Sequence, residues 1–204
     1  MGYEHEIFLS YPRKARIFEQ WVLTRFKPFL EDYLGSELGY MPRVFVDQIN
    51  IVPGESWPDR LRFALARSRC LVAIFTPLYF SSEWCCREFA AMRHRGQRLG
   101  LTSADNPTGL AIPVNLWDGD SFPSCVGDLH HLDCRPYMFV GKCFEDSDLF
   151  LEFQQKLQGW IPKVAGLVRN TPDWSQQWTT TDWLDVPYQE LLIPTPKIGQ
   201  PRMT

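Results

Sequence analysis

The feature that most constrains the fold of this 204-residue chain is an unbroken apolar run, Cys70–Phe75. A strand that is apolar at every position must be covered on both faces, which is typical of the centre of a parallel sheet. Segments rich in β-branched and aromatic residues, bounded by turn residues, occur on both sides of this run. The further strands expected from them are Glu6–Tyr11, Arg43–Asp47, Leu110–Val114 and Tyr137–Val140.

Amphipathic segments alternate with the expected strands. Apolar residues recur in them at helical spacing, and capping residues such as Ser82 mark helix starts. The expected helices run from Ile17 to Leu38, from Ser56 to Ser68, from Glu83 to about Arg95 and from Asp148 to Val168. Pro28 should kink or break the first of them, and Gly35 and Gly39 supply its stop. This alternation predicts a three-layer α/β domain with a parallel sheet.

Polar residues follow the expected strands, at the edge of the sheet where ligands bind in open α/β folds. They are Ser10-Tyr11, Asp47-Gln48, Thr76-Pro77 and Asn115–Asp118. Pro113, inside the fourth strand, has no N–H to donate, so it is expected at the sheet edge or where a missing donor does no harm. No G-x-G-x-x-G and no G-x-x-x-x-G-K-[ST] pattern follows a strand, which argues against dinucleotide-binding and phosphate-loop sites.

Charge and hydropathy narrow the classes of partner. The 21 Lys and Arg against 24 Asp and Glu give a net charge of -3, which does not favour a nucleic-acid partner. No apolar stretch approaches the ~20 residues of a membrane helix, and the N-terminus lacks the basic start of a secretory signal. The six cysteines include no C-x-x-C pair, which favours a reducing compartment. We therefore expect a cytoplasmic protein that contacts neither membrane nor nucleic acid.

Two histidines, His130 and His131, lie between Cys125 and Cys134. Cysteine and histidine are zinc ligands, so the cluster can be interpreted as a metal site. None of these residues has the helical or knuckle spacing of ligand pairs, however. Polar loop residues are the favoured interpretation, and no metal is predicted.

The composition changes after residue 170. Five prolines and three tryptophans, Trp174, Trp178 and Trp183, fall within the last 34 residues, with little periodicity. We divide the chain into a domain over residues 1–170 and a Pro/Trp-rich C-terminal extension over residues 171–204. Its aromatic side chains must pack either on the chain's own domain or on a partner, and packing on the domain is favoured because tryptophan is normally well buried.

Three short motifs, in order along the chain, resemble those of the Toll/interleukin-1 receptor (TIR) domain family. Ile7–Tyr11 resembles its opening strand, and Ser81–Phe89 resembles the S-x-W-C-x-x-E stretch that begins its third helix. Between them, Arg43–Asp47 with Val52-Pro53-Gly54 resembles the second strand and the following "BB" loop. The resemblance covers about residues 4 to 168 and leaves the extension unexplained. It implies a flavodoxin-like fold with a five-stranded parallel sheet flanked by helices.

The resemblance also implies a chemistry for Glu88, which stands at the position of the family's catalytic glutamate. NAD-cleaving members break the nicotinamide–ribose bond, and the pyridinium leaves as a neutral group without a proton. One carboxylate can therefore serve, by holding the ribose and stabilising an oxocarbenium-like charge. The alternative is a solvated helix residue. Ser10, Tyr11, Arg13, Asp47 and Trp84 are the expected substrate-binding residues, each also open to an ordinary structural role. Cys85 and Cys86 lack a paired histidine and are rejected as nucleophiles.

Two functions remain open at this stage. The favoured one is an NAD+ glycohydrolase or ADP-ribosyl cyclase of the prokaryotic defence-type branch, an effector in bacterial anti-phage immunity that self-assembly activates. It uses NAD+ as substrate, needs no cofactor, and allows an activating sensor protein as a partner. The alternative is a non-catalytic TIR module that scaffolds a signalling complex. Either form would self-associate through the BB loop, whose expected contact residues are Ile49, Ile51, Val52, Pro53 and Gly54.

Overall fold

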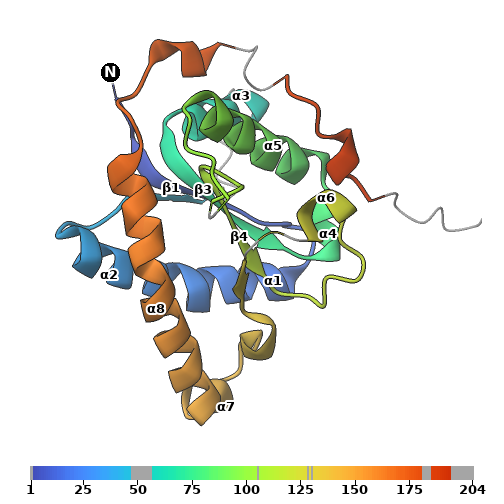
Figure 1. The fold of residues 1–204 in the computed structure, drawn as a ribbon. Coiled ribbons are helices and arrows are strands. Elements are labelled where there is room, and N and C mark those ends of the chain that lie inside the picture. Colours follow the sequence, from blue (N-terminus) through green and yellow to red (C-terminus); the bar gives the residue numbers. More distant parts are fainter. Residues whose placement is uncertain are drawn as a thin grey trace, which may run out of the picture.

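A computed structural model describes residues 2–46, 57–104, 106–127, 129, 131–180 and 185–193, with the side chains of residues 57 and 58 excepted. The described residues contain one parallel sheet of five strands in the order β2-β1-β3-β4-β5, flanked by helices (Figure 1). The strands are β1 (His5–Ser10), β2 (Val44–Val46), β3 (Ser68–Phe75), β4 (Ala111–Asn115) and β5 (Leu132–Asp133). The expected α/β fold with a five-stranded parallel sheet is confirmed.

The apolar run lies in β3, at the centre of the sheet. Every residue of Cys70–Phe75 is at most 1% exposed, because β1 and β4 flank the strand and helices cover both faces. The register pairs Ser10 of β1 with Ala73, and Ala73 with Pro113 of β4. Since the strands are parallel, their carboxyl ends meet at one edge of the sheet, and Ser10 lies there.

Helices cover the two faces of the sheet (Figure 1). One face carries α1 (Arg16–Trp21), α2 (Lys27–Leu38) and α8 (Asp148–Asn170), and the other carries α3 (Trp57–Ala66) and α5 (Glu83–Arg98). Three one-turn helices, α4 (Pro77–Phe80), α6 (Ser124–Gly127) and α7 (Lys142–Glu145), connect larger elements. Single 3-10 turns occupy Arg135–Tyr137, Gln176–Thr179 and Gln189–Leu191. No helix in the described part of the chain combines the length and apolar character that a bilayer crossing demands.

A kink or a break was expected at Pro28; the helix is distorted just before this residue but is not broken. A π-helical turn, Val22–Phe26, separates α1 from α2, and Pro28 falls in the first turn of α2. The nitrogen of Lys27 donates to the carbonyl of Val22, five residues back, so the π-helical turn carries the helix up to Pro28, which has no N–H to donate. Gly39 ends α2 in the left-handed region, at φ 82°, where glycine carries no Cβ penalty. The expectation for Gly35 was wrong, because this residue lies inside the helix.

The expected fifth strand, Tyr137–Val140, is wrong. The strand is instead Leu132–Asp133, and Tyr137 belongs to a 3-10 turn that contains Pro136. The carbonyl of Tyr137 accepts from Trp21 Nε1 at 2.7 Å, so it is not available to a strand ladder. A strand of two residues is too short to show a hydrophobic periodicity in the sequence.

Two places were expected for Pro113: the sheet edge, or a site where its missing N–H donor does no harm. The structure agrees with the second. The nitrogen of Leu116 donates to Phe75 in β3, whereas the carbonyl of Asn115 accepts from Cys134 on the β5 side. Alternation along the strand therefore turns the nitrogen of Pro113 toward β5. The described ladder between β4 and β5 begins at Val114 and Leu132, so the nitrogen of Pro113 takes no part in it.

The extension packs on the domain. It leaves the end of α8, its turn Gln176–Thr179 packs on α3, and its last described turn, Gln189–Leu191, lies near α4 and α6 (Figure 1). Trp178 is 2% exposed and lies 4.9 Å from the guanidinium carbon of Arg95, which is itself fully buried. Trp174 donates its Nε1 hydrogen to the carbonyl of Ala66 at 3.1 Å. Packing of these two tryptophans on the domain is confirmed, and Trp183 lies outside the described residues.

Candidate functional site

A cavity of about 440 Å³ opens where the carboxyl end of β1 meets the start of α5. Its volume lies within the range of small-molecule sites. The turn after β1 forms one wall, the α4–α5 connection and the first turns of α5 form another, and α3 contributes one leucine. The described lining residues are Phe8, Leu9, Ser10, Tyr11, Arg13, Lys14, Leu61, Ser81, Ser82, Glu83, Trp84, Cys85 and Glu88.

Glu88 is the buried carboxylate of this cavity. It lies in the second turn of α5, a helix whose N-cap is Ser82, with the Ser82 hydroxyl accepting from the nitrogen of Cys85. The residue is only 7% exposed, and Ser10 Oγ donates to its Oε2 at 2.6 Å. A carboxylate this far from water needs such donors, because burying an unpaired charge is costly. The structure thus joins two residues that are 78 positions apart in the chain.

The hydroxyl of Ser10 has a second neighbour, the phenol of Tyr79, which sequence analysis missed. The two oxygens are 3.1 Å apart, and the Tyr79 hydroxyl also lies 3.0 Å from the carbonyl of Cys85, to which it can donate. Burial raises the pKa of the Tyr79 phenol well above its usual range, so the phenol keeps its proton. The sequence signal that could have indicated this helix is Thr76-Pro77, a helix N-cap followed by proline at the first helical position, which begins α4.

Three more of the expected substrate-binding residues line the same cavity. Trp84 is half-buried and stands one turn before Glu88 on α5, so both side chains lie on one face of the helix. Tyr11 is 6% exposed, and Arg13 lies in the turn after it. Lys14, which was not among the expected residues, adds a second cation to this wall. The wall opposite α5 is therefore suited to an anionic group.

The remaining expected site residues either lie outside the described residues or are absent from the described lining of the cavity. Asp47 and the loop residues Ile49, Ile51, Val52, Pro53 and Gly54 lie outside the described residues. Asn115, the last residue of β4, and the residues after it, Leu116–Asp118, are absent from the described lining of the cavity. Asn115 instead accepts from the nitrogen of Trp117 through its side-chain oxygen, at 2.9 Å.

The thiols beside Glu88 are not activated. Burial is the main cause that raises the pKa of Cys86 to about 12, and the pKa of Cys85 rises further, with the charge of Glu88 adding to burial. Both groups therefore stay protonated at neutral pH and cannot act as thiolate nucleophiles. This agrees with their rejection from the sequence.

The extension reaches the mouth of the cavity. The hydroxyl of Tyr188 donates to Glu83, which lines the cavity, and accepts from Arg87 at 2.8 Å. The nitrogen of Ile193 donates to the carbonyl of Phe80 in α4 at 2.9 Å. The last described part of the extension is thus attached to the same corner, α4 and the start of α5, that carries Tyr79 and Glu88.

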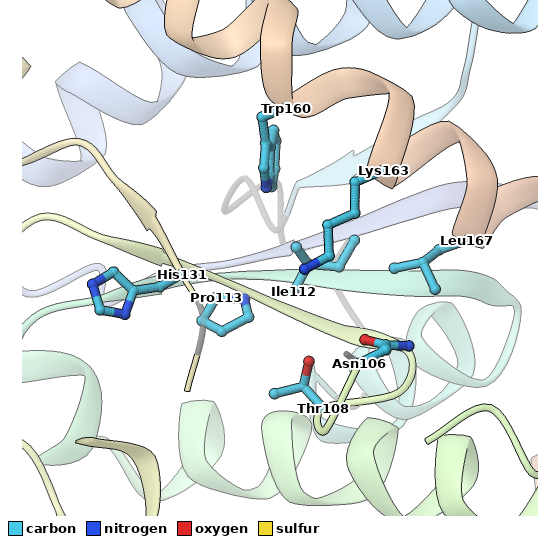
Figure 2. Close-up of a pocket in the computed structure, with 8 residues that line it drawn as sticks. All are labelled: Asn106, Thr108, Ile112, Pro113, His131, Trp160, Lys163 and Leu167. Atoms are coloured by element: carbon cyan, nitrogen blue, oxygen red, sulfur yellow. The ribbon is translucent and has the colours of Figure 1, made fainter. Parts of the chain in front are cut away.

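A smaller cavity of about 60 Å³ lies elsewhere, between β4 and α8 (Figure 2). Trp160 and Lys163 extend toward it from α8, and His131 and Pro113 lie on the strand side. Its described lining includes no carboxylate, and its volume is a fraction of that beside Glu88. Among the described residues, no three His, Cys, Asp or Glu side chains gather as a metal site; His130 is outside that set.

Comparison with known proteins agrees with the motifs around this site. The family model described as TIR domain matches residues 7–137. A probable 2' cyclic ADP-D-ribose synthase, BdTIR of Brachypodium distachyon, is 30% identical over 81 residues, which are 39% of this chain and 36% of that protein. The chain therefore matches only about a third of the length of that relative.

Two solved structures are also similar. The TIR domains of the activated Roq1 resistosome, which recognises the pathogen effector XopQ, share 23% identity at a TM-score of 0.40, covering 82% of this chain and 90% of that one. The TIR domain of the Toll-related receptor TRR-2 from Hydra magnipapillata shares 16% identity at a TM-score of 0.40, covering 74% and 98%. The family match extends over more than half of the sequence, and the chain belongs to the TIR domain family.

Proposed function

We propose that this protein cleaves the nicotinamide–ribose bond of NAD+, with Glu88 as the catalytic residue. The observation that carries the proposal is a buried carboxylate, held by a hydroxyl donor at 2.6 Å, on the wall of a cavity of about 440 Å³. A largely buried carboxylate in a cleft is a candidate functional group, because burying an acid is costly unless it is needed there. The name of the Brachypodium relative, a probable 2' cyclic ADP-D-ribose synthase, supports the same bond as the target.

The reaction needs one carboxylate and no acid. The bond between ribose C1′ and the pyridinium nitrogen breaks with both electrons passing to nitrogen, so nicotinamide leaves neutral. Glu88 stabilises the positive charge that develops on C1′ and the ring oxygen. A water oxygen, or a hydroxyl of the same ADP-ribose, then forms the new bond to C1′ and releases one proton. The first route gives ADP-ribose and the second a cyclic isomer.

The other lining residues have complementary roles in this proposal. Trp84, one turn from Glu88, stacks on the cationic nicotinamide ring. Arg13 and Lys14 pair with the diphosphate, for which guanidinium and ammonium groups are suitable donors. Ser10 and Tyr11 complete the wall at the end of β1. Asp47, which follows β2 in the sequence, remains a proposed ribose contact.

The biological setting is a further part of the proposal. We infer a cytoplasmic effector of bacterial anti-phage immunity, activated when copies self-associate through residues 48–55 or when a sensor protein brings them together. The apolar residues Ile49, Ile51 and Val52 within one short loop support self-association, because exposed aliphatic side chains favour docking on a neighbour. The second candidate function, a non-catalytic scaffold, would use the same loop without Glu88.

The experiment that separates the two functions is incubation of the concentrated protein with NAD+, followed by chromatographic separation of the products. Catalysis predicts free nicotinamide together with ADP-ribose, a cyclic isomer or both. The scaffold function predicts intact NAD+ at every protein concentration, including concentrations at which the protein is fully assembled. That result, obtained with folded protein, would contradict the proposal.

A further inference from the structure

The side chain that lies behind Ser10 is the phenol of Tyr79, in the one-turn helix α4 (Pro77–Phe80). Thr76 caps this helix by accepting from the nitrogen of Tyr79 at 3.2 Å. The ring is fully buried, with its centroid 5.3 Å from that of Phe75 and 5.4 Å from that of Phe80. Its backbone and its ring are therefore both fixed, and so is the position of its hydroxyl.

The phenol is absent from the described lining of the cavity, whereas Ser10 and Glu88 both line it. A hydrogen-bonded path runs from the buried phenol to the cavity wall. The Tyr79 hydroxyl lies 3.1 Å from Ser10 Oγ, which donates to Glu88 Oε2 at 2.6 Å. The carbonyl of Cys85, 3.0 Å from the Tyr79 oxygen, is the other acceptor for the single phenol hydrogen. The path therefore connects α4 to α5 through β1.

Each hydroxyl on this path carries one hydrogen and can accept two more. When Glu88 is a carboxylate, Ser10 must donate to it, and the Ser10 oxygen is then left as an acceptor. Two groups in the described contacts can donate to it: the thiol of Cys85, and the hydroxyl of Tyr79 when its one hydrogen points to Ser10 and not to the carbonyl of Cys85. A hydroxyl is a stronger donor than a thiol, and a donor on that side fixes the rotation of the Ser10 hydroxyl and strengthens its bond to the carboxylate.

We propose that Tyr79 and Ser10 form a hydroxyl pair that positions the carboxylate of Glu88 for the reaction, with Tyr79 acting through Ser10 and without touching the substrate. The inference rests on the proposed function, because the reaction is what the pair serves. It assigns to Ser10 a positioning role beyond the substrate contact expected from its place after β1.

The test compares Tyr79→Phe, Ser10→Ala and the double variant in nicotinamide release from NAD+. Tyr79→Phe keeps the ring and should lower kcat about tenfold, as small misplacements of a reacting group do. The KM should stay unchanged, because the phenol does not line the cavity. Ser10→Ala should lower kcat at least as much, and adding Tyr79→Phe to it should cause no further fall.

Matched controls separate positioning from simple loss of a buried hydroxyl. Ser68, at the opposite end of the sheet, is fully buried and donates to the carbonyl of Ala64 at 2.7 Å, so Ser68→Ala removes a comparable group. Tyr137→Phe removes a phenol hydroxyl from another buried tyrosine. Both controls should lower the melting temperature by no more than the test variants do, and both should keep the wild-type kcat.

Each outcome bears on the inference. A Tyr79→Phe protein with wild-type kcat, or one whose loss multiplies with that of Ser10→Ala, would overturn it and leave the proposed function standing. Should Tyr79→Phe fail to fold, the kcat of Ser10→Ala is compared with that of Ser68→Ala instead. A wild-type kcat in Ser10→Ala would then contradict the proposed role of the hydroxyl pair. A wild-type protein that never releases nicotinamide would overturn both proposals.

Discussion

At the scale of single residues, the candidate site depends on which polar groups burial leaves reactive. Glu88 is 7% exposed and accepts from Ser10 at 2.6 Å, whereas the neighbouring thiols of Cys85 and Cys86 have no histidine beside them in the described lining. Burial opposes the charged form of both thiols. Because the thiols keep their protons, the carboxylate is the group equipped for chemistry.

The thiols provide a residue-scale prediction. Because burial raises the pKa of Cys86 to about 12 and that of Cys85 further, their thiolate forms are scarce until the pH nears those values. Iodoacetamide at mildly alkaline pH should therefore modify the exposed Cys143 and spare Cys85 and Cys86. Peptide mass mapping measures this, and nicotinamide release should survive the treatment. Rapid modification of Cys85 with matching loss of activity would instead indicate a thiol nucleophile.

The cationic wall provides a second prediction at this scale. Arg13 and Lys14 line the cavity opposite α5, and contacts with a diphosphate would be present in both the ground state and the transition state. Arg13→Ala should therefore raise the KM for NAD+ about tenfold and leave kcat nearly unchanged. Steady-state kinetics measure both constants. An unchanged KM would place the diphosphate elsewhere.

At the scale of elements, the extension acts as part of the domain's own packing. Arg95 of α5 is fully buried, and it donates to the carbonyl of Ser68 and to the hydroxyl of Tyr3. The ring of Trp178 covers the same guanidinium. Burial lowers the pKa of Arg95 from its usual value, which expresses the cost of keeping this cation from water. The extension therefore helps to stabilise a helix that also carries Glu88.

The element-scale prediction concerns this contact. Trp178→Ala should lower the free energy of unfolding by about 3 kcal/mol, because a large buried aromatic and a cation–π contact are both lost. Urea denaturation followed by fluorescence or circular dichroism measures the change. Trp117, which is 39% exposed, offers the matched control, and Trp117→Ala should cost less. Equal stability of Trp178→Ala and wild type would show that the extension contributes nothing to the fold.

At the scale of the whole molecule, sequence patterns predicted the elements whose signals are local. The buried run of β3, the cap at Ser82 and the distortion of the helix before Pro28 all follow from residue chemistry. The fifth strand was misplaced because two residues, Leu132–Asp133, owe their conformation to pairing with β4. Tyr79 was missed because its relation to Ser10 exists only after the chain folds.

Assembly is the other property of the whole molecule, and its prediction comes from the sequence of residues 48–55, which lie outside the described residues. Specific activity should rise with protein concentration, and Ile51→Asp should suppress both self-association and turnover without lowering the melting temperature. A dilution series, assayed for nicotinamide and followed by analytical ultracentrifugation, measures both. Constant specific activity in a protein that stays monomeric throughout would refute the dependence.

The most direct test of the proposed chemistry is nicotinamide release by two matched variants, Glu88→Gln and Glu6→Gln. Both residues are buried glutamates, at 7% and 5% exposure, but Glu6 lies at the other end of β1 and accepts from the nitrogen of Arg43 at 2.6 Å. We predict that Glu88→Gln folds and loses release by about 100-fold or more, whereas Glu6→Gln stays active. Release at the wild-type rate by folded Glu88→Gln would contradict the assignment of Glu88 as the catalytic residue.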